Sequence, residues 1–271
     1  MSRIISINDI NTPELAVYAR LTEAQLKKNQ DIFIAESVKV IEVALSKGLC
    51  PVSFLMEKRQ IEGIGASIIS RYPNVPVYTA PREVLCSLTG FELTRGVLCA
   101  MRRPKPLSLD SALKDAKRVA VLEGLSDGAN VGSVFRNAAA LGFDAVLLYH
   151  NCSEPLNRRT VRVSMGSVFL LPWAFFDKDH FPKPQNAVEY LKAKGFLTAA
   201  LALKNDSINI DDEVLSNAQR LALFLGSEGS GLDTQTINAC DKTVMIPMQH
   251  GVDSLNVAAA AAISFWQLKR K

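Results

Sequence analysis

The sequence has few of the residues that bind metals or cross-link a fold. Its 271 residues include five cysteines and three histidines, and no two cysteines form a Cys-x-x-Cys pair. None of their spacings is typical of a zinc site, so we expect no metal centre. The odd number of cysteines, in a chain long enough to fold without cross-links, indicates reduced thiols. The net charge is only +4, which permits a nucleic-acid partner without requiring one.

Long apolar runs are also missing. The longest weakly polar stretch, Leu255–Leu268, is shorter than a membrane span and dominated by alanine, which indicates a packed helix rather than an anchor. The first residues, MSRIISINDINTPEL, hold only a broken apolar stretch and predict no signal peptide. We therefore expect a cytoplasmic protein without membrane contact. Apolar residues still make up 48% of the chain, enough for a sizeable core.

Strands and helices are expected to alternate in the first hundred residues. The predicted strands are Ile32–Ala35, Val52–Met56, Val75–Tyr78 and Val97–Met101, and the predicted helices are Thr12–Lys28, Ser37–Lys47, Ile61–Ser70 and Arg82–Leu88. The charged segment Arg102–Pro106 follows and contains two prolines, which is typical of a linker. We therefore predict two domains, residues 1–103 and residues 104–271.

A second alternation follows the linker. The predicted strands are Arg118–Leu122, Ala145–Tyr149, Val168–Leu171, Leu197–Leu201, Leu221–Leu225 and Thr243–Ile246, and the predicted helices are Val131–Leu141, Asn157–Val163, Asn186–Lys194, Thr234–Ala239 and Ser254–Lys269. Strands separated by helices favour an α/β fold with a mostly parallel sheet covered on both faces. Ligands of such sheets bind at the carboxyl ends of the strands, in the loops.

Three polar patches fall at those ends. The first, Asn130–Phe143, opens a helix rich in small residues and contains Asn130 and Arg136. Taken alone, it is a loose phosphate or cofactor signal that has neither the GxGxxG nor the P-loop spacing. Asn130 could equally cap the helix and Arg136 could point to solvent.

The second patch, Gly226–Gly231, holds three glycines and one charge, Glu228. Its backbone could contact a ligand, or it could be an ordinary loop with a solvated glutamate. The third patch runs from Ile246 to Ala262. Its Ser254 and Asn256 could act as helix caps and nothing more, and its alanine run fits either core packing or a helix–helix dimer interface.

Together the three patches resemble the SpoU/TrmH branch of the SPOUT RNA methyltransferases. The first patch matches the family's Asn-x-Gly-Ser-x-x-Arg-Asn-Ala, the second its Gly-x-Glu-x-x-Gly, and the third its Ile-Pro-Met followed by Ser-Leu-Asn-Val. The resemblance implies transfer of a methyl group from S-adenosylmethionine to a ribose 2′-hydroxyl of structured RNA, either rRNA or tRNA. It also implies that the last two patches form a deep trefoil knot around the donor, without a metal.

The resemblance further implies the site residues. The catalytic set would be Arg136, Asn130, Glu228, Ser254 and Asn256, and the cofactor-binding set Gly226, Ile246, Met248 and Leu255. Arg136 would act as a base or, as we prefer, as a cation that stabilises an alkoxide or holds a phosphate, because a guanidinium is a poor base at neutral pH. The family uses no histidine where this chain has His250, which we treat as a loop residue.

The first domain resembles the small ribosomal-protein-like RNA-binding domain that many family members carry. Members usually have a glycine after the glutamate, where this chain has Ser37. The arginines of the helix Asn157–Val163 could contact RNA or form a solvated face. We expect a homodimer built partly on the terminal helix, where the Phe265-Trp266 pair is expected to be exposed.

Two other functions remain to be weighed against this one. A nucleotide-dependent oxidoreductase on a Rossmann sheet is disfavoured because no strand is followed by GxGxxG. An RNA-binding module that has lost catalysis is disfavoured because all five residues of the catalytic set are present. Calorimetry with S-adenosylmethionine and with NAD would separate these interpretations.

Overall fold

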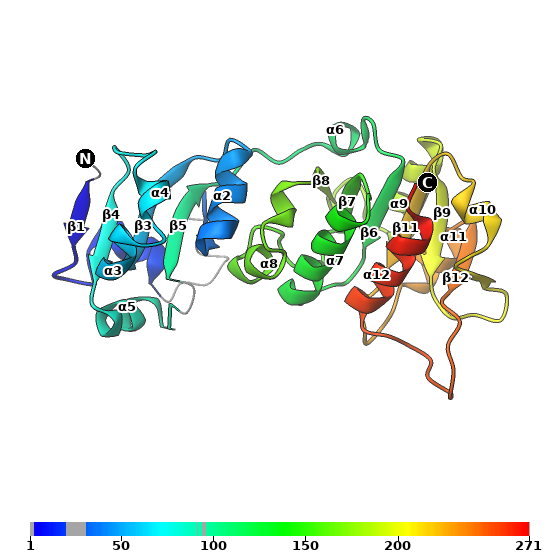
Figure 1. The fold of residues 1–271 in the computed structure, drawn as a ribbon. Coiled ribbons are helices and arrows are strands. Elements are labelled where there is room, and N and C mark those ends of the chain that lie inside the picture. The colour runs from blue at the N-terminus through cyan, green and yellow to red at the C-terminus, as the bar shows by residue number, and fades with distance from the viewer. Residues whose placement is uncertain (1–2, 20–30, 91, 94–95, 271) are drawn as a thin grey trace. The chain divides into compact units, whose positions relative to one another are not determined.

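The computed structural model describes residues 3–19, 31–90, 92–93 and 96–270. They form two compact units, one of Met1–Lys105 with Leu156–Phe169 and one of Pro106–Pro155 with Leu170–Lys271 (Figure 1). No helix in these ranges is long and apolar enough to cross a membrane. Most of the predicted helix Thr12–Lys28 lies outside the described residues, and its described part is a 3-10 helix, η1 (Pro13–Tyr18).

The first unit is built on a mixed five-stranded sheet. Its strand order is β1 (Ile4–Ser6), β4 (Val77–Ala80), β3 (Pro51–Glu57), β5 (Val97–Arg102) and β2 (Ile32–Glu36). The strands β1, β4 and β3 are parallel, whereas β5 runs antiparallel to both β3 and β2. Beside the sheet, η1 and α5 (Arg82–Thr89) contribute buried leucines to one apolar cluster. The buried hydroxyl of Tyr18 donates to the carbonyl of Ser53 at 2.8 Å.

One prediction in this unit is wrong, and one unusual residue has a backbone conformation that explains it. The single helix predicted for residues 61–70 is wrong, because the chain forms two short helices, α3 (Lys58–Glu62) and α4 (Ala66–Ile69). The glycines between them favour a break in the helix. The helix α2 (Val38–Ser46) is preceded by Ser37, whose φ of +84° lies in the region that favours glycine. A glycine, which similar sequences usually have at this position, would adopt this positive φ without strain.

A segment from the middle of the chain completes the first unit. It contains α8 (Arg158–Val163) and η2 (Ser167–Phe169), so the strand predicted for residues 168–171 is wrong. Arg158 donates to the buried carboxylate of Glu36 at 3.0 Å, and Arg162 lies 3.8 Å from the other oxygen. Arg158 thus serves an ion pair within the protein rather than a solvated face.

The second unit is built on a parallel seven-stranded sheet, which confirms the predicted α/β class. Its strand order is β10 (Ile208–Asn209), β12 (Lys242–Met245), β9 (Leu197–Leu201), β11 (Leu221–Leu225), β6 (Arg118–Leu122), β7 (Ala145–Tyr149) and β8 (Trp173–Phe176). All its neighbouring strands pair in parallel. The carboxyl ends of β9, β11 and β12 therefore lie at one edge of the sheet.

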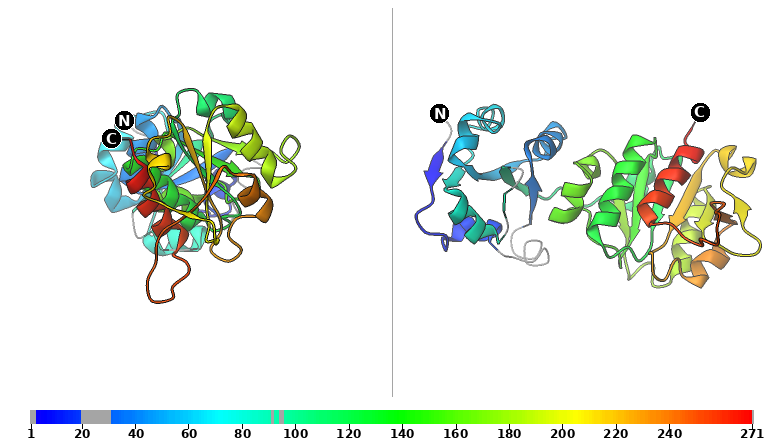
Figure 2. Two further views of the ribbon diagram at one scale, coloured as in Figure 1. Left: turned by 90° about the vertical axis from the view of Figure 1, so that its right-hand side faces the viewer. Right: turned by 60° about the horizontal axis from the view of Figure 1, so that its bottom comes forward.

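Helices cover both faces of this sheet. On one face α7 (Gly128–Ala140) lies along α12 (Val257–Leu268), as Figures 1 and 2 show, and α10 (Glu213–Ser216) packs against α12. The other face carries α6 (Leu109–Leu113), α9 (Pro184–Ala193) and α11 (Thr234–Ala239), whose apolar residues share a core cluster with Val119 and Val121 of β6.

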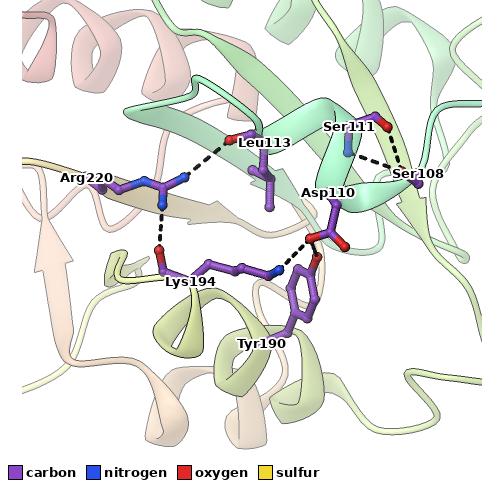
Figure 3. A network of polar contacts seen from close by, with 7 residues as sticks. All are labelled: Ser108, Asp110, Ser111, Leu113, Tyr190, Lys194 and Arg220. Atoms are coloured by element: carbon purple, nitrogen blue, oxygen red, sulfur yellow. Dashed lines mark hydrogen bonds and ion pairs between the residues drawn. The ribbon is translucent and has the colours of Figure 1, made fainter.

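A polar network fixes α6, the first helix after the linker, to this second face (Figure 3). The carboxylate of Asp110 accepts hydrogen bonds from the Tyr190 hydroxyl at 2.9 Å and the Lys194 ammonium at 2.5 Å. Arg220 donates to the carbonyls of Lys194, at 2.6 Å, and Leu113, at 3.3 Å. The Lys194 ammonium lowers the pKa of Asp110, while burial and then Asp110 raise the pKa of Tyr190 to about 12.

Candidate active site

A pocket of about 570 Å³ opens at the carboxyl ends of β9, β11 and β12. This volume falls within the range of small-molecule sites, about 300–1,000 Å³. Its walls come from residues 201–203, 225–232 without Gly229, 244–248 and 252–255, together with Ile237, Val257 and Ala260. All four residues predicted to bind the cofactor line it, namely Gly226, Ile246, Met248 and Leu255.

One wall of this pocket was missed by the sequence analysis. Residues 201–203 follow β9, and Leu203 is 62% exposed there. Only the position of these residues in the predicted sheet could have identified them. The carboxyl end of β9 must lie beside that of β11 once the two strands pair in parallel. Nothing polar in this segment distinguishes it from an ordinary loop.

The glycine loop, residues 226–232, is folded tightly back on itself. A Cβ atom on Gly226 would lie only 2.2 Å from the carbonyl carbon of Gly231 and 2.3 Å from the amide nitrogen of Leu232. Both neighbours are backbone atoms and cannot rotate away, so only glycine fits at this position. Ser227 pairs with Gly231 in an isolated bridge across the loop, and its hydroxyl lies 2.8 Å from that of Ser230.

Three of the predicted catalytic side chains meet beside this loop. The amide of Asn130 donates to one oxygen of Glu228 at 3.0 Å, and the amide of Asn256 donates to the same oxygen. The two asparagines also interact, at 3.4 Å. Glu228 itself lines the pocket, so the cluster lies at the pocket's edge. Residues from α7, from the glycine loop and from the start of α12 are thereby brought to one place.

The helix caps decide which of these side chains are available. Asp127 caps α7 by accepting from the amide of Ala129, so the capping alternative for Asn130 is wrong. Asn256 does cap α12, since its carbonyl oxygen accepts from Ala258 at 2.9 Å while its amide donates to Glu228. Ser254 does not cap that helix, because the helix begins only at Val257.

The other two predicted catalytic residues make no side-chain hydrogen bond with this cluster. Arg136 is exposed on α7, and its side chain makes no hydrogen bond or ion pair with any other residue that the structure describes. Its neighbour Asn137 donates instead to the carbonyl of Ala258 at 2.8 Å, which fastens α7 to α12. Ser254 lines the pocket, and its hydroxyl lies 3.3 Å from the carboxylate of Asp253. His250 is exposed in the loop before it and does not line the pocket.

The site offers a shaped cavity with hydrogen-bonding groups at its edge. Among the described parts of the chain, no three His, Cys, Asp or Glu side chains gather closely enough to hold a metal ion. The apolar side chains of Leu225, Met248 and Leu255 suit an organic ligand, and the glycine loop offers exposed backbone groups beside them. Such a site can bind a small organic molecule next to a polar reaction centre.

Comparison with known proteins assigns the chain to a family. Residues 117–266 match the family model described as the SpoU rRNA Methylase family. An "uncharacterized tRNA/rRNA methyltransferase" of Mycobacterium bovis is 36% identical over 246 residues, covering 90% of this chain and 83% of its own. The 23S rRNA (guanosine(2553)-2′-O)-methyltransferase of Bacillus subtilis is 24% identical over 253 residues, covering 93% and 94%.

A solved structure shows the same fold. The S-adenosylmethionine-bound rRNA methyltransferase of Sinorhizobium meliloti has a TM-score of 0.80 at 22% identity, covering 98% of this chain and 97% of its own. The resemblance inferred from the three motifs is thus confirmed, and the chain belongs to the SpoU family of RNA methyltransferases.

Proposed function

We propose that this enzyme transfers a methyl group from S-adenosylmethionine to a ribose 2′-hydroxyl of structured RNA, in rRNA or tRNA. The observation that carries the proposal is the cluster of Asn130, Glu228 and Asn256 at the edge of the pocket. It places polar groups beside a cavity of the right size for a nucleoside-bearing donor. The relative from Bacillus subtilis, named as a ribose 2′-O-methyltransferase of 23S rRNA, supports the choice of acceptor.

The pocket residues fit the proposed donor. Backbone groups of Gly226, Ile246 and Leu255 would hold its adenosine and methionine parts, and Met248 would contribute apolar contact. The loop closes on itself where the backbone of Gly226 meets that of Gly231 and Leu232, and all three residues line the pocket. When bound, the sulfonium supplies an electrophilic methyl group and requires no metal.

As the methyl carbon bonds to the ribose 2′-oxygen, its bond to sulfur would break and the hydroxyl proton would pass to solvent, so the protein must orient the ribose and stabilise the alkoxide. We assign orientation to Asn130, Glu228 and Asn256, with Ser254 beside them on the pocket wall. No described residue donates to the second carboxylate oxygen of Glu228, which leaves that oxygen able to accept from a ribose hydroxyl. Arg136 would serve as a fixed cation that stabilises the developing alkoxide or holds the adjacent phosphate. Its exposure leaves the guanidinium accessible to RNA.

Three finer features complete the proposal. The first unit would bind RNA as a ribosomal-protein-like domain, and its mixed sheet is compatible with that role. The glycine loop and residues 246–256 would form a trefoil knot around the donor, and both segments line the same pocket. The enzyme would act as a homodimer through α12, where Ile263 is 42% and Trp266 61% exposed. Phe265, expected to be exposed as well, is fully buried and packs on Phe143 at 4.0 Å between ring centroids.

Binding and transfer are tested together. Calorimetry should show that the purified protein binds S-adenosylhomocysteine in the presence of a chelator and does not bind NAD. Tritiated S-adenosylmethionine should label rRNA or tRNA from a strain lacking the gene, and the labelled nucleotide should resist alkaline cleavage because its 2′-oxygen is blocked. A strict metal requirement, NAD binding, or label on a base would contradict the proposal.

Light scattering at micromolar concentration should give twice the monomer mass, and a monomer would refute the dimer.

A further inference from the structure

Glu123 is a buried carboxylate with no role in the function proposed above. It directly follows β6 and is only 6% exposed. The alternation along the strand places it on the same face as Val119 and Val121, which belong to the core under α9 and α11. No ion pair joins it to a cation among the described residues. A carboxylate in such surroundings is costly to bury unless it makes hydrogen bonds that compensate.

The hydrogen bonds of Glu123 join the two ends of the glycine loop. Its backbone amide donates to the carbonyl of Leu225, the last residue before the loop, at 3.0 Å. One carboxylate oxygen accepts from the amide of Asp233, the first residue after the loop, at 2.6 Å. The other accepts from the hydroxyl of Thr236 in α11, also at 2.6 Å. A single residue therefore holds the entry and the exit of the segment that forms one wall of the pocket.

We propose that Glu123 is a positioning residue that fixes both ends of the glycine loop and thereby shapes the donor pocket. The inference rests on the proposed function for the identity of what the loop binds. A loop with three glycines has large conformational freedom, and its ordering on ligand binding costs free energy unless its ends are already held. Glu228, inside this loop, gains its place beside Asn130 and Asn256 from the same constraint.

The surroundings of Glu123 indicate that its acceptor geometry, rather than its charge, performs this task. The groups that interact with it electrostatically are Tyr149, Cys152, Asp233 and Cys240, none of which is a cation. Burial raises the pKa of Glu123, so the site does not favour the ionised form. Glutamine has the same shape, can accept from the Asp233 amide, and can donate to the Thr236 hydroxyl, which is able to accept.

Glu123→Gln and Glu123→Ala are compared by hydrogen exchange of residues 226–233 and by calorimetry with S-adenosylhomocysteine. Glu123→Ala takes the acceptor away from the Asp233 amide and from the buried Thr236 hydroxyl, so we expect about tenfold faster loop exchange and about tenfold weaker binding. Glu123→Gln should stay within about threefold of the wild type in both measurements. Leu85→Ala, buried on α5 in the core of the first unit, lowers stability away from the loop and should leave both readouts unchanged.

The outcomes separate the two proposals. Wild-type loop exchange in Glu123→Ala would overturn the positioning role, and so would a Glu123→Gln variant as impaired as Glu123→Ala. If Glu123→Ala does not fold, Thr236→Val removes one of the two donors and should still accelerate exchange in the loop; its failure to do so would equally overturn the role. A wild type that binds no S-adenosylhomocysteine, while the variants show the expected exchange, would refute the proposed donor and leave the positioning role intact.

Discussion

Replacing Gly226 with alanine gives the sharpest test of how the pocket is built. The added methyl group would lie 2.2 Å from the carbonyl carbon of Gly231 and 2.5 Å from its oxygen. Carbon atoms pack at about 3.5–4.0 Å, so the two backbone segments must separate by about 1.3 Å or more. The movement falls on the pocket wall itself.

The size of the effect follows from that displacement. Overpacking of this kind typically costs about 1–3 kcal/mol, and a cost near the upper end, about 2.8 kcal/mol, corresponds to about a hundredfold in binding affinity. We therefore expect Gly226→Ala to weaken the binding of S-adenosylhomocysteine about a hundredfold by calorimetry. The far-ultraviolet circular dichroism spectrum should be retained, because the change is confined to one loop.

Gly229 supplies the matched control. It lies in the same loop, is exposed, does not line the pocket, and would have nothing within 4 Å of an added Cβ atom. Gly229→Ala should therefore bind within about twofold of the wild type. If Gly226→Ala binds as well as Gly229→Ala, the close approach at Gly226 is not what shapes the pocket, and the reasoning is refuted.

Three further predictions concern other parts of the molecule. Ser37→Gly relieves a backbone strain of about 1–3 kcal/mol. It also removes a weak helix cap and increases the conformational entropy of the unfolded chain, which offsets part of the gain. Urea denaturation should therefore show the first unit about 1 kcal/mol more stable, and a lower midpoint would contradict this. Arg136→Lys should lose about a hundredfold in single-turnover rate with little change in donor binding, since the planar fork is lost; recovery of the wild-type rate by pH 10 would favour a base. Asp110→Asn should be less stable than the wild type at pH 7. Because the pKa of Asp110 is lowered in the folded state, this difference should shrink as pH falls below about 3.8 and vanish below the lowered pKa; a difference unaffected by acid would show that the Lys194 contact contributes nothing.

The sequence was most informative where strands are buried on both sides. The predicted bounds of β6, β7, β9 and β11 agree with the structure, because continuous apolar runs of this length are typical of central parallel strands. The sequence predicted a strand at residues 168–171, but β8 lies at Trp173–Phe176. Val168 and Phe169 are apolar because they pack within the first unit and not because they form a strand. Phe169 lies 5.5 Å from Phe33 between ring centroids.

The site was predictable in its motifs but not in its geometry. The motifs identified Asn130, Glu228 and Asn256, yet only the folded chain shows that two amides donate to one carboxylate oxygen. The sequence analysis did not single out Glu123. It is a charged residue on the same face of the strand as the core residues Val119 and Val121, and that pattern indicates a buried carboxylate. Its role depends on Asp233, which lies far along the chain, and no local pattern reports such a contact.

Because residues from both sides of the linker build the first unit, a cut at the linker does not separate the two units cleanly. Residues 156–169 come from the middle of the second unit's sequence, yet they complete the first unit and supply Arg158 to the buried Glu36. A chain cut after Lys105, at the proline-rich linker, would leave that carboxylate unpaired and would uncover the side chain of Phe33. The linker is thus a boundary in composition, and residues 156–169, which belong to the first unit, lie beyond it in the chain. During synthesis residues 156–169 emerge only after β6 and β7, so we expect the first unit to be completed while the second is already being made.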